Sequence, residues 1–267
     1  MKRLDGKVAV ILGAAAKDNM AQVIARRYAA ENAKVVIAGR KEDALKELAD
    51  EINGNYALCD ITKKTDIESL ANFATDTYGK VDIAINCAGW GLLEKLQKTT
   101  EDQLNAVTAL HINGSFFFLQ VFAGQMSQTG GGSIILTSSA SVYCTLYHHA
   151  AYIGTKAGAD AVMRCFANEF GSKGIKVNSI APGLTSTPMT EKEINTPGLL
   201  DAFLKEYPLG RIGTTNDVAN AALWLGSDES FMTGQVLQIN GGLTLRRNPL
   251  PWEINASMKA AANNKGD

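Results

Sequence analysis

The sequence predicts an α/β protein: a single domain of the Rossmann type, whose doubly wound sheet has about seven mainly parallel strands. Three observations favour this fold class. Short apolar runs such as 8–12 alternate with longer segments whose apolar residues recur at helical spacing. These runs are continuous rather than alternating, as in strands that are buried on both faces. The 267 residues suit one such domain, and we find no internal repeat or interdomain linker.

Composition and charge describe an ordinary globular chain. Hydrophobic residues make up 46% and charged residues 20%, and 26 Lys and Arg nearly balance 27 Asp and Glu. This balance gives no reason to expect a nucleic-acid or membrane-surface partner. No segment approaches the roughly 18 apolar residues that a membrane span needs. The short apolar run at 8–16 reads as a strand and turn rather than as a secretion signal.

The cysteines and histidines predict neither a disulfide nor a metal site. No two cysteines have Cys-x-x-Cys spacing, so we expect free thiols in a reducing compartment, the cytoplasm. The chain has 3 His. His148 and His149 lack a carboxylate or thiol at ligand spacing, so we interpret them as loop residues that line a pocket. The four cysteines are Cys59, Cys87, Cys144 and Cys165.

The first predicted unit has the layout of a dinucleotide-binding fold. It consists of a strand at 8–12, a turn at Gly13, a helix at 20–30 and a strand at 34–38, together about 30 residues. The start of such a helix offers free N–H groups and a partial positive charge to a pyrophosphate. Alone, Gly13 is equally typical of an ordinary turn at a strand end.

The end of the second strand indicates which cofactor is preferred. An NAD site usually has an acidic residue there for the ribose diol, but this chain has Gly39 followed by Arg40. A guanidinium can pair with a 2′-phosphate, and Lys17 adds a second cation near the same place. We therefore predict NADP(H) over NAD(H), and expect Gly39→Asp to favour NADH. The alternative is that Arg40 simply faces solvent before the next helix.

The remaining elements follow from the same patterns. Thr99 and Asp102 resemble a capping box that opens a long helix. Asn113-Gly114 inside that helix would be costly without a function or a packing reason. We predict further helices at 42–52, 66–78 and 151–170, and strands at 55–58, 81–85, 133–136, 176–180 and 236–239.

The most informative segment runs from Ser133 to Lys156. An apolar strand ends at Ser138 and Ser139, and the following helix carries Tyr152 and Lys156 four residues apart, on one face. A fixed ammonium favours the phenolate and lowers the tyrosine pKa, so such a tyrosine can transfer a proton near neutral pH. Tyr and Lys at this spacing are often mere surface neighbours. A serine just upstream, at a strand end, favours catalysis.

These motifs resemble the short-chain dehydrogenase/reductase family over roughly residues 4–245. The family carries a Ser about a dozen residues before Tyr-x-x-x-Lys, as Ser139 stands before Tyr152-Ile-Gly-Thr-Lys156. Asn86-Cys87-Ala88-Gly89 is similar to the family's Asn-Asn-Ala-Gly, and His111-Ile112-Asn113-Gly114 to its Asn-x-x-Gly. Leu209-Gly210-Arg211, Asp217-Val218-Ala219 and Gly241-Gly242 resemble its final part.

The resemblance implies a role for each matching residue. Ser139 would orient the substrate oxygen, Tyr152 would exchange its proton, and Lys156 would bind the cofactor ribose. Asn113 would hold a water molecule that links Lys156 to solvent, and Thr187 would meet the nicotinamide carboxamide. The implied cofactor-binding residues are Gly13, Lys17, Asn19, Met20, Gly39, Arg40, Asp60 at the adenine, Ile61, Asn86, Ala88, Gly89, Tyr152, Lys156, Pro182, Gly183, Leu184 and Thr187.

The turn after Gly13 departs from the family's glycine-rich pattern. It has no further glycine before the helix, and Asn19-Met20-Ala21 resembles the longer turn of bacterial enoyl-acyl-carrier-protein reductases. An enoyl-thioester reductase is therefore an alternative, although those enzymes space Tyr and Lys further apart. A non-catalytic NADP-binding sensor or scaffold is the other alternative, although such proteins tend to lose the Ser, Tyr or Lys.

The resemblance also implies a mobile substrate loop at 188–206 and subunit pairing at the last strand, in a homotetramer or a dimer. We expect a small, mostly apolar carbonyl or alcohol substrate near Trp90, Leu92, Tyr143, Leu146 and Leu200. Residues 246–267 extend beyond the 1–245 domain. In this extension, we expect 249–252 to pack on folded protein because Trp252 is large and apolar, and 260–267 to be disordered.

Overall fold

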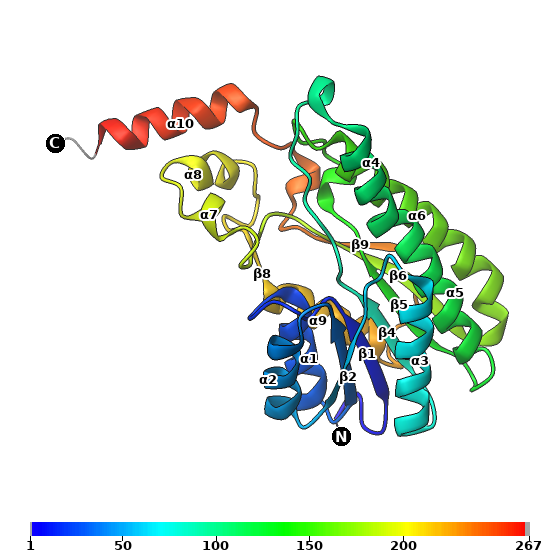
Figure 1. Cartoon of the computed structure of the whole chain (residues 1–267). Coiled ribbons are helices and arrows are strands. Elements are labelled where there is room, and N and C mark those ends of the chain that lie inside the picture. The colour runs from blue at the N-terminus through cyan, green and yellow to red at the C-terminus, as the bar shows by residue number, and fades with distance from the viewer. Residues whose placement is uncertain (1, 265–267) are drawn as a thin grey trace.

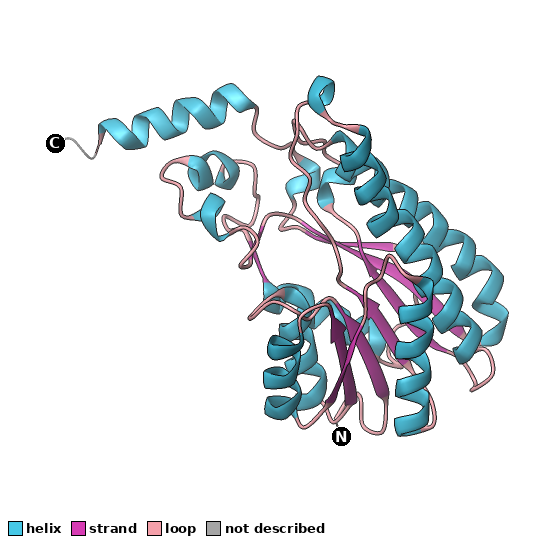
Figure 2. Ribbon diagram, in the orientation of Figure 1, coloured by secondary structure: helices cyan, strands magenta, loops and turns pink. Residues whose placement is uncertain are grey.

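The computed structural model describes residues 2–264 and confirms the predicted fold class. Seven parallel strands form one sheet in the order β3-β2-β1-β4-β5-β6-β9, with helices on both faces (Figures 1 and 2). The chain reverses direction across the sheet between β1 and β4, where ligands bind in doubly wound folds. The strands are β1 (Val8–Leu12), β2 (Lys34–Gly39), β3 (Asn55–Leu58), β4 (Ile83–Asn86), β5 (Gly132–Thr137), β6 (Ile175–Pro182) and β9 (Val236–Ile239).

Each central strand contributes to two hydrophobic cores. Along β1, Ala9 and Ile11 belong to the core beneath one layer of helices, whereas Val10 and Leu12 belong to the other. Because side chains alternate between the faces of a strand, burial on both sides requires the continuous apolar run that the sequence shows. The first core includes α1 (Met20–Ala30), α2 (Glu42–Ile52) and α9 (Thr215–Gly226), and the second includes α3 (Lys64–Tyr78), α5 (Gly114–Met126) and α6 (Ala150–Phe170).

The helix cap at α4 (Glu101–Thr108) differs from the predicted one by one residue, whereas most other predicted boundaries shift by one or two residues. Thr99 and Asp102 do not form the capping box. Instead the Thr100 hydroxyl accepts from the Gln103 N–H, and the Gln103 side chain accepts from the Thr100 N–H. The amide of Gln103 serves as well as a carboxylate in this motif.

The stretch Glu101–Met126 is continuous helix, with a π-helical turn at Ala109–Asn113 between α4 and α5. By length and composition it could cross a membrane, contrary to the expectation that no segment approaches a span. Its α5 part instead packs Phe118, Leu119 and Phe122 into the second core. Gly114 has a packing reason, because a Cβ there would lie 2.9 Å from Ile61 Cγ1.

A smaller layer covers the carboxyl ends of the strands. It contains β7 (Thr185–Ser186), α7 (Glu191–Ile194), α8 (Leu199–Leu204), β8 (Gly213–Thr214) and α10 (Pro251–Asn263), and α10 lies against α8 (Figure 1). Short 3₁₀ turns occur at Leu96–Lys98, Ala140–Val142, Gly171–Lys173 and Leu243–Leu245.

The C-terminal extension is more ordered than expected. Residues 260–263 are helical, as the end of α10, which corrects the predicted disorder there; residues 265–267 lie outside the described part. Asn248 and Pro249 are buried, as expected for a packed tail, but Trp252 is 59% exposed and its ring meets that of Tyr147 edge-on. The tail is anchored by the residues before the tryptophan, not by the tryptophan.

Candidate active site

A cavity of about 890 Å³ opens at the carboxyl ends of the strands, beneath α7, α8 and the start of α10. The turn before α1 forms one end of it, and the loop after β5 and the first turns of α6 form its floor. Its size and its largely apolar wall are typical of a small-molecule site.

Ser139, Tyr152 and Lys156 all line this cavity, as the sequence predicted. Lys156 Nζ donates to the Thr137 carbonyl oxygen at 2.6 Å and lies 5.9 Å from the centre of the Tyr152 ring. The Ser139 hydroxyl is hydrogen-bonded to Ser141 Oγ at 2.8 Å and accepts from the Ser141 N–H. The end of β5 therefore positions both the serine and the lysine.

Burial dominates the acid–base properties of these groups. It raises the pKa of Tyr152, and the Ser139 side chain opposes this only in part. This corrects the expectation that Lys156 would set the tyrosine pKa by lowering it. Burial also lowers the pKa of Lys156 to about 8, against the opposing effect of Asp160. The lysine therefore exchanges its proton close to neutral pH.

Asn113, expected beside Lys156, is exposed and does not line the cavity. His111 lies beside Tyr152 and Lys156 instead: it is 1% exposed, outside the cavity lining, and its ring is edge-on to Tyr152 at 5.5 Å between centres. The spacing of the motif could have indicated this: when Asn-x-x-Gly is counted back from Gly114, its Asn position is occupied by His111 rather than Asn113.

The contacts of His111 define its tautomer. Thr155 Oγ1 donates to a carbonyl of the preceding turn, at Ala151 or Tyr152, so it must accept from His111 Nδ1 at 2.9 Å. Nε2 is then unprotonated and accepts from the Trp90 N–H at 3.2 Å. Burial and the nearby Lys156 charge lower the pKa of His111 to about 3. A neutral imidazole thus ties the Trp90 loop to α6.

The turn before α1 packs closely against the loop that follows β4. Gly13 has φ +105°, and a Cβ there would lie 2.8 Å from the Ala88 nitrogen. Asn19 caps α1 by accepting from the Gln22 N–H, and its Nδ2 donates to the Gly13 carbonyl oxygen at 2.7 Å. Asn19 and Met20 line the cavity, whereas Lys17 is exposed, 3.8 Å from Glu47.

Gly39, Arg40 and Asp60 lie at the ends of β2 and β3, outside the lining of the cavity. Arg40 is exposed, and a Cβ at Gly39 would lie 2.7 Å from Ala15 Cβ. Burial raises the pKa of Asp60, but hydrogen bonds from Thr62 and the charge of Arg40 outweigh it and lower the pKa overall. Ile61 is buried beneath Gly114.

The other predicted cofactor residues border the same space. Asn86 is buried and its Oδ1 accepts from the Ala88 N–H at 2.9 Å; neither of the two is among the lining residues. A Cβ at Gly89 would lie 3.6 Å from both His111 Nε2 and Lys156 Nζ. Residues that line the cavity from the far side are Pro182, Gly183, Leu184 and Thr187.

These observations fit a nicotinamide dinucleotide. The capped start of α1 faces the cavity through Asn19 and Met20, Gly89 lines it, and Lys156 lines it where it can donate to ribose hydroxyls. Gly13 packs against Ala88 and does not itself line the cavity. We therefore take the α1 end of the cavity as the cofactor side and the α8–α10 end as the substrate side.

The substrate side agrees only in part with the sequence. Trp90 and Leu146 line the cavity, and so do His148 and His149, but Leu92 and Leu200 do not. The tail, which was expected to pack on folded protein, forms part of this wall, and its lining residues are Asn248, Pro249, Pro251, Ile254 and Asn255.

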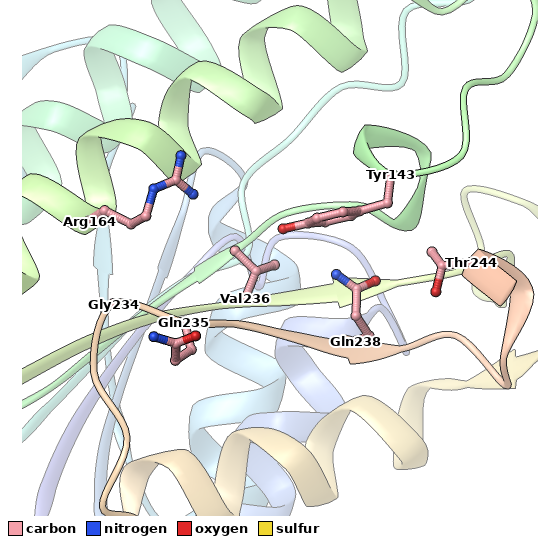
Figure 3. A pocket seen from close by; sticks show the side chains of 7 residues that line it. All are labelled: Tyr143, Arg164, Gly234, Gln235, Val236, Gln238 and Thr244. Atoms are coloured by element: carbon pink, nitrogen blue, oxygen red, sulfur yellow. The ribbon is translucent and has the colours of Figure 1, made fainter.

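Tyr143, also expected at the substrate, borders a different hollow along β9, with Arg164, Gln235, Gln238 and Thr244 (Figure 3). In the figure the Tyr143 ring and the Arg164 side chain lie on the same side of the strand, at opposite ends of the hollow. β9 is an edge strand of the sheet, at the end opposite to β3. Tyr143 is therefore removed from the predicted substrate residues.

Comparison with known proteins identifies relatives over most of the chain. A family model described as enoyl-(acyl carrier protein) reductase matches residues 13–244. The 7α-hydroxysteroid dehydrogenase of Escherichia coli (strain K12) is 36% identical over 246 residues, which cover 90% of this chain and 95% of that protein. A short-chain type dehydrogenase/reductase structure from Mycobacterium ulcerans has a TM-score of 0.89 at 28% identity, covering 96% of this chain and 98% of that one. A 7α-hydroxysteroid dehydrogenase structure, complexed with NADH and 7-oxo glycochenodeoxycholic acid, has a TM-score of 0.84 at 34% identity, covering 90% and 95%.

Proposed function

Because this chain belongs to the short-chain dehydrogenase/reductase family, we propose that it is an NAD(P)-dependent enzyme that interconverts a ketone or aldehyde and an alcohol. The observation that carries the proposal is the meeting of Ser139, Tyr152 and Lys156 at one cavity floor. When bound, the nicotinamide supplies or accepts the hydride.

The protein's own groups manage the proton and the geometry. In reduction, Tyr152 gives its proton to the substrate oxygen, which Ser139 orients. Lys156, held by the Thr137 carbonyl, carries the positive charge that stabilises the resulting phenolate. His111 takes the supporting place that the sequence assigned to Asn113, by holding the Trp90 loop against α6.

We propose NADP(H) as the preferred cofactor and a small, mostly apolar substrate. Arg40 supports NADP(H), since it is exposed at the end of β2 where a 2′-phosphate would lie. NAD(H) is the second candidate, because one solved relative is complexed with NADH. The apolar substrate is supported by Trp90, Leu146 and Phe203 in the cavity wall.

The experiment that tests this function is a panel assay. Purified protein is mixed with NADPH or NADH and with ketones or enoyl thioesters, and cofactor oxidation is followed; alcohols are tested in reverse. Carbonyl turnover supports the proposal. Turnover of enoyl thioesters alone supports the enoyl reductase, which the description of the matching family model favours. Cofactor binding without any turnover indicates a sensor or scaffold.

We further propose a cytoplasmic homotetramer or dimer that pairs through the β9 edge, with residues 1–245 as the catalytic domain, 188–206 as the substrate loop and 246–267 as an extension. The unpaired edge of β9 supports the pairing. Light scattering of the purified protein, with a charge introduced at Val236 as the variant, tests it.

A further inference from the structure

Asp160 is a buried acid that the reaction itself does not use. It lies four residues after Lys156 and eight after Tyr152, on the same face of α6, and is 3% exposed. A buried carboxylate is expensive unless it is paired and hydrogen-bonded. The contacts that compensate for burying this carboxylate next to the catalytic lysine are therefore informative.

One side of Asp160 faces the end of β5. Ser138 Oγ donates to Asp160 Oδ2 at 2.5 Å, and the Ser138 N–H donates to the Ile180 carbonyl oxygen at 2.8 Å. Ser138 stands between Thr137, whose carbonyl holds Lys156, and Ser139. Asp160 thus fixes the backbone that positions both catalytic neighbours.

The other contribution of Asp160 is its charge. Burial lowers the pKa of Lys156. The charge of Asp160 makes the largest opposing contribution, and Cys87 in the loop after β4 makes a smaller one. The remaining groups around this pair are few. Arg164 lies on α6 itself, Ser179 comes from β6, and Tyr143 comes from the turn after β5. His111 is neutral.

We propose that Asp160 is a positioning residue that keeps Lys156 charged and Ser138 in place, and so determines the pH above which the site stops binding its cofactor. The inference rests on the proposed function, because it assumes that charged Lys156 holds the cofactor ribose. It adds a residue to the site that neither the sequence motifs nor the cavity lining includes.

Two variants separate the charge from the hydrogen bond. Asp160→Asn keeps an oxygen that can accept from Ser138 but removes the charge. Ser138→Ala keeps the charge and removes the hydrogen bond. Cofactor binding should weaken at high pH as Lys156 loses its proton, and we call this part of the binding curve its alkaline limb. Without its counter-charge Lys156 loses its proton at lower pH, so the alkaline limb of Asp160→Asn should move down by about one pH unit. The alkaline limb of Ser138→Ala should stay within about 0.3 pH unit of the wild type, because both charges remain.

The readout is the dissociation constant of NADPH and of NADH between pH 6 and 10, measured by fluorescence without substrate. An alkaline limb that stays in place in Asp160→Asn overturns the inference. A wild type that binds neither cofactor overturns both the inference and the proposed function. Binding with the predicted shift, but no turnover of any substrate, supports the inference and contradicts only the proposed reaction.

A third variant keeps the test valid if Asp160→Asn folds poorly. In Lys156→Met/Asp160→Asn the charge that Asp160 balances is gone. Its thermal midpoint should therefore exceed the midpoint of Asp160→Asn. A double variant that is no more stable than the single one shows that Asp160 does not act through Lys156.

Discussion

At the scale of the residue, the site depends on groups whose surroundings change their chemistry. Tyr152 is half-buried and its pKa lies above the ordinary value because burial disfavours the phenolate. Lys156 is buried and its pKa is lowered to about 8 for the corresponding reason. The raised pKa keeps the phenol of Tyr152 protonated, and a pKa of about 8 leaves Lys156 mostly charged at neutral pH, so both groups are proton donors there, the state that carbonyl reduction needs.

Tyr152→Phe removes the proton donor and little else. The ring still packs edge-on against His111, so cofactor binding should persist while kcat for reduction falls by roughly 10²–10⁴-fold. Steady-state kinetics with the best substrate of the panel measure the loss. A variant that keeps more than about a hundredth of the wild-type kcat would remove Tyr152 from its assigned role.

Arg40→Ala tests how the cofactor is selected. A hydrogen bond to a charged group contributes about 1.5–3 kcal/mol, so NADPH should bind roughly 10- to 100-fold more weakly and NADH almost equally well. Values of kcat/KM for both cofactors give the answer. Equal losses for both cofactors, or a wild type that already prefers NADH, would show that Arg40 does not read the phosphate.

Gly39→Asp, expected from the sequence to favour NADH, is not a clean companion to this test. A Cβ at Gly39 would lie 2.7 Å from Ala15 Cβ, so any side chain disturbs the turn before α1. We expect Gly39→Asp to weaken both cofactors.

His111 and Asn113 form a matched pair of variants. His111→Ala removes both contacts that hold the Trp90 loop to α6, so kcat/KM should fall about 10- to 100-fold through misplacement of the site. Asn113→Ala changes an exposed side chain and should leave kcat/KM within about twofold. The reverse order of effects would restore Asn113 to its predicted role.

At the scale of the element, the extension acts as part of the cavity wall. Asn248 Nδ2 donates to the Cys144 carbonyl oxygen at 2.7 Å, which anchors the tail before α10 begins. A Cβ at Gly198, in the substrate loop, would lie 2.5 Å from the Ser257 carbonyl oxygen, so loop and helix touch backbone to backbone. Substrate loop and tail therefore form one layer.

Truncation after Leu245 removes α10 and the segment that leads into it from this layer. If its contacts contribute about 2 kcal/mol, the Tm should fall by roughly 4–8 °C, and KM for the substrate should rise because a wall is lost. Calorimetry and kinetics measure the two effects. Trp252→Ala is the control, since this side chain is 59% exposed and should change neither. A truncated chain with unchanged Tm and KM would make the tail a passive extension.

At the scale of the whole molecule, His111 connects the site to acid stability. Its pKa is about 3 in the folded chain against an ordinary 6.5, so below pH 6.5 the unfolded chain binds a proton that the folded chain excludes. Stability is therefore lost as the pH falls from 6.5 toward 3.

This loss can be measured against a variant that does not titrate. At pH 4.5 the histidine should lower the free energy of unfolding by about 2–3 kcal/mol relative to pH 7. Between pH 7 and pH 4.5 the free energy of unfolding of His111→Gln should fall by about 2–3 kcal/mol less than that of the wild type, because glutamine does not titrate. Urea unfolding at both pH values gives the comparison, and parallel curves for the two proteins would contradict the assignment.

The sheet and the shared position of Tyr152 and Lys156 could be predicted from the sequence alone. Continuous apolar runs require strands buried on both faces, and the four-residue spacing of Tyr152 and Lys156 requires one helix face. Both are local consequences of helix and strand periods, so they could be predicted without knowing any distant contact. Ser139 followed because a strand end places it beside that helix.

The tertiary structure alone decided what depends on contacts between distant segments. The π-helical turn and the packing of α5 turn His111 inward and leave Asn113 outside. Ala15 fills the space at Gly39, and burial rather than Lys156 controls the Tyr152 pKa. The tail closes the cavity because Asn248 meets a carbonyl more than a hundred residues away. Such outcomes depend on which surfaces meet and how much water they exclude, and neither quantity is contained in a local sequence pattern.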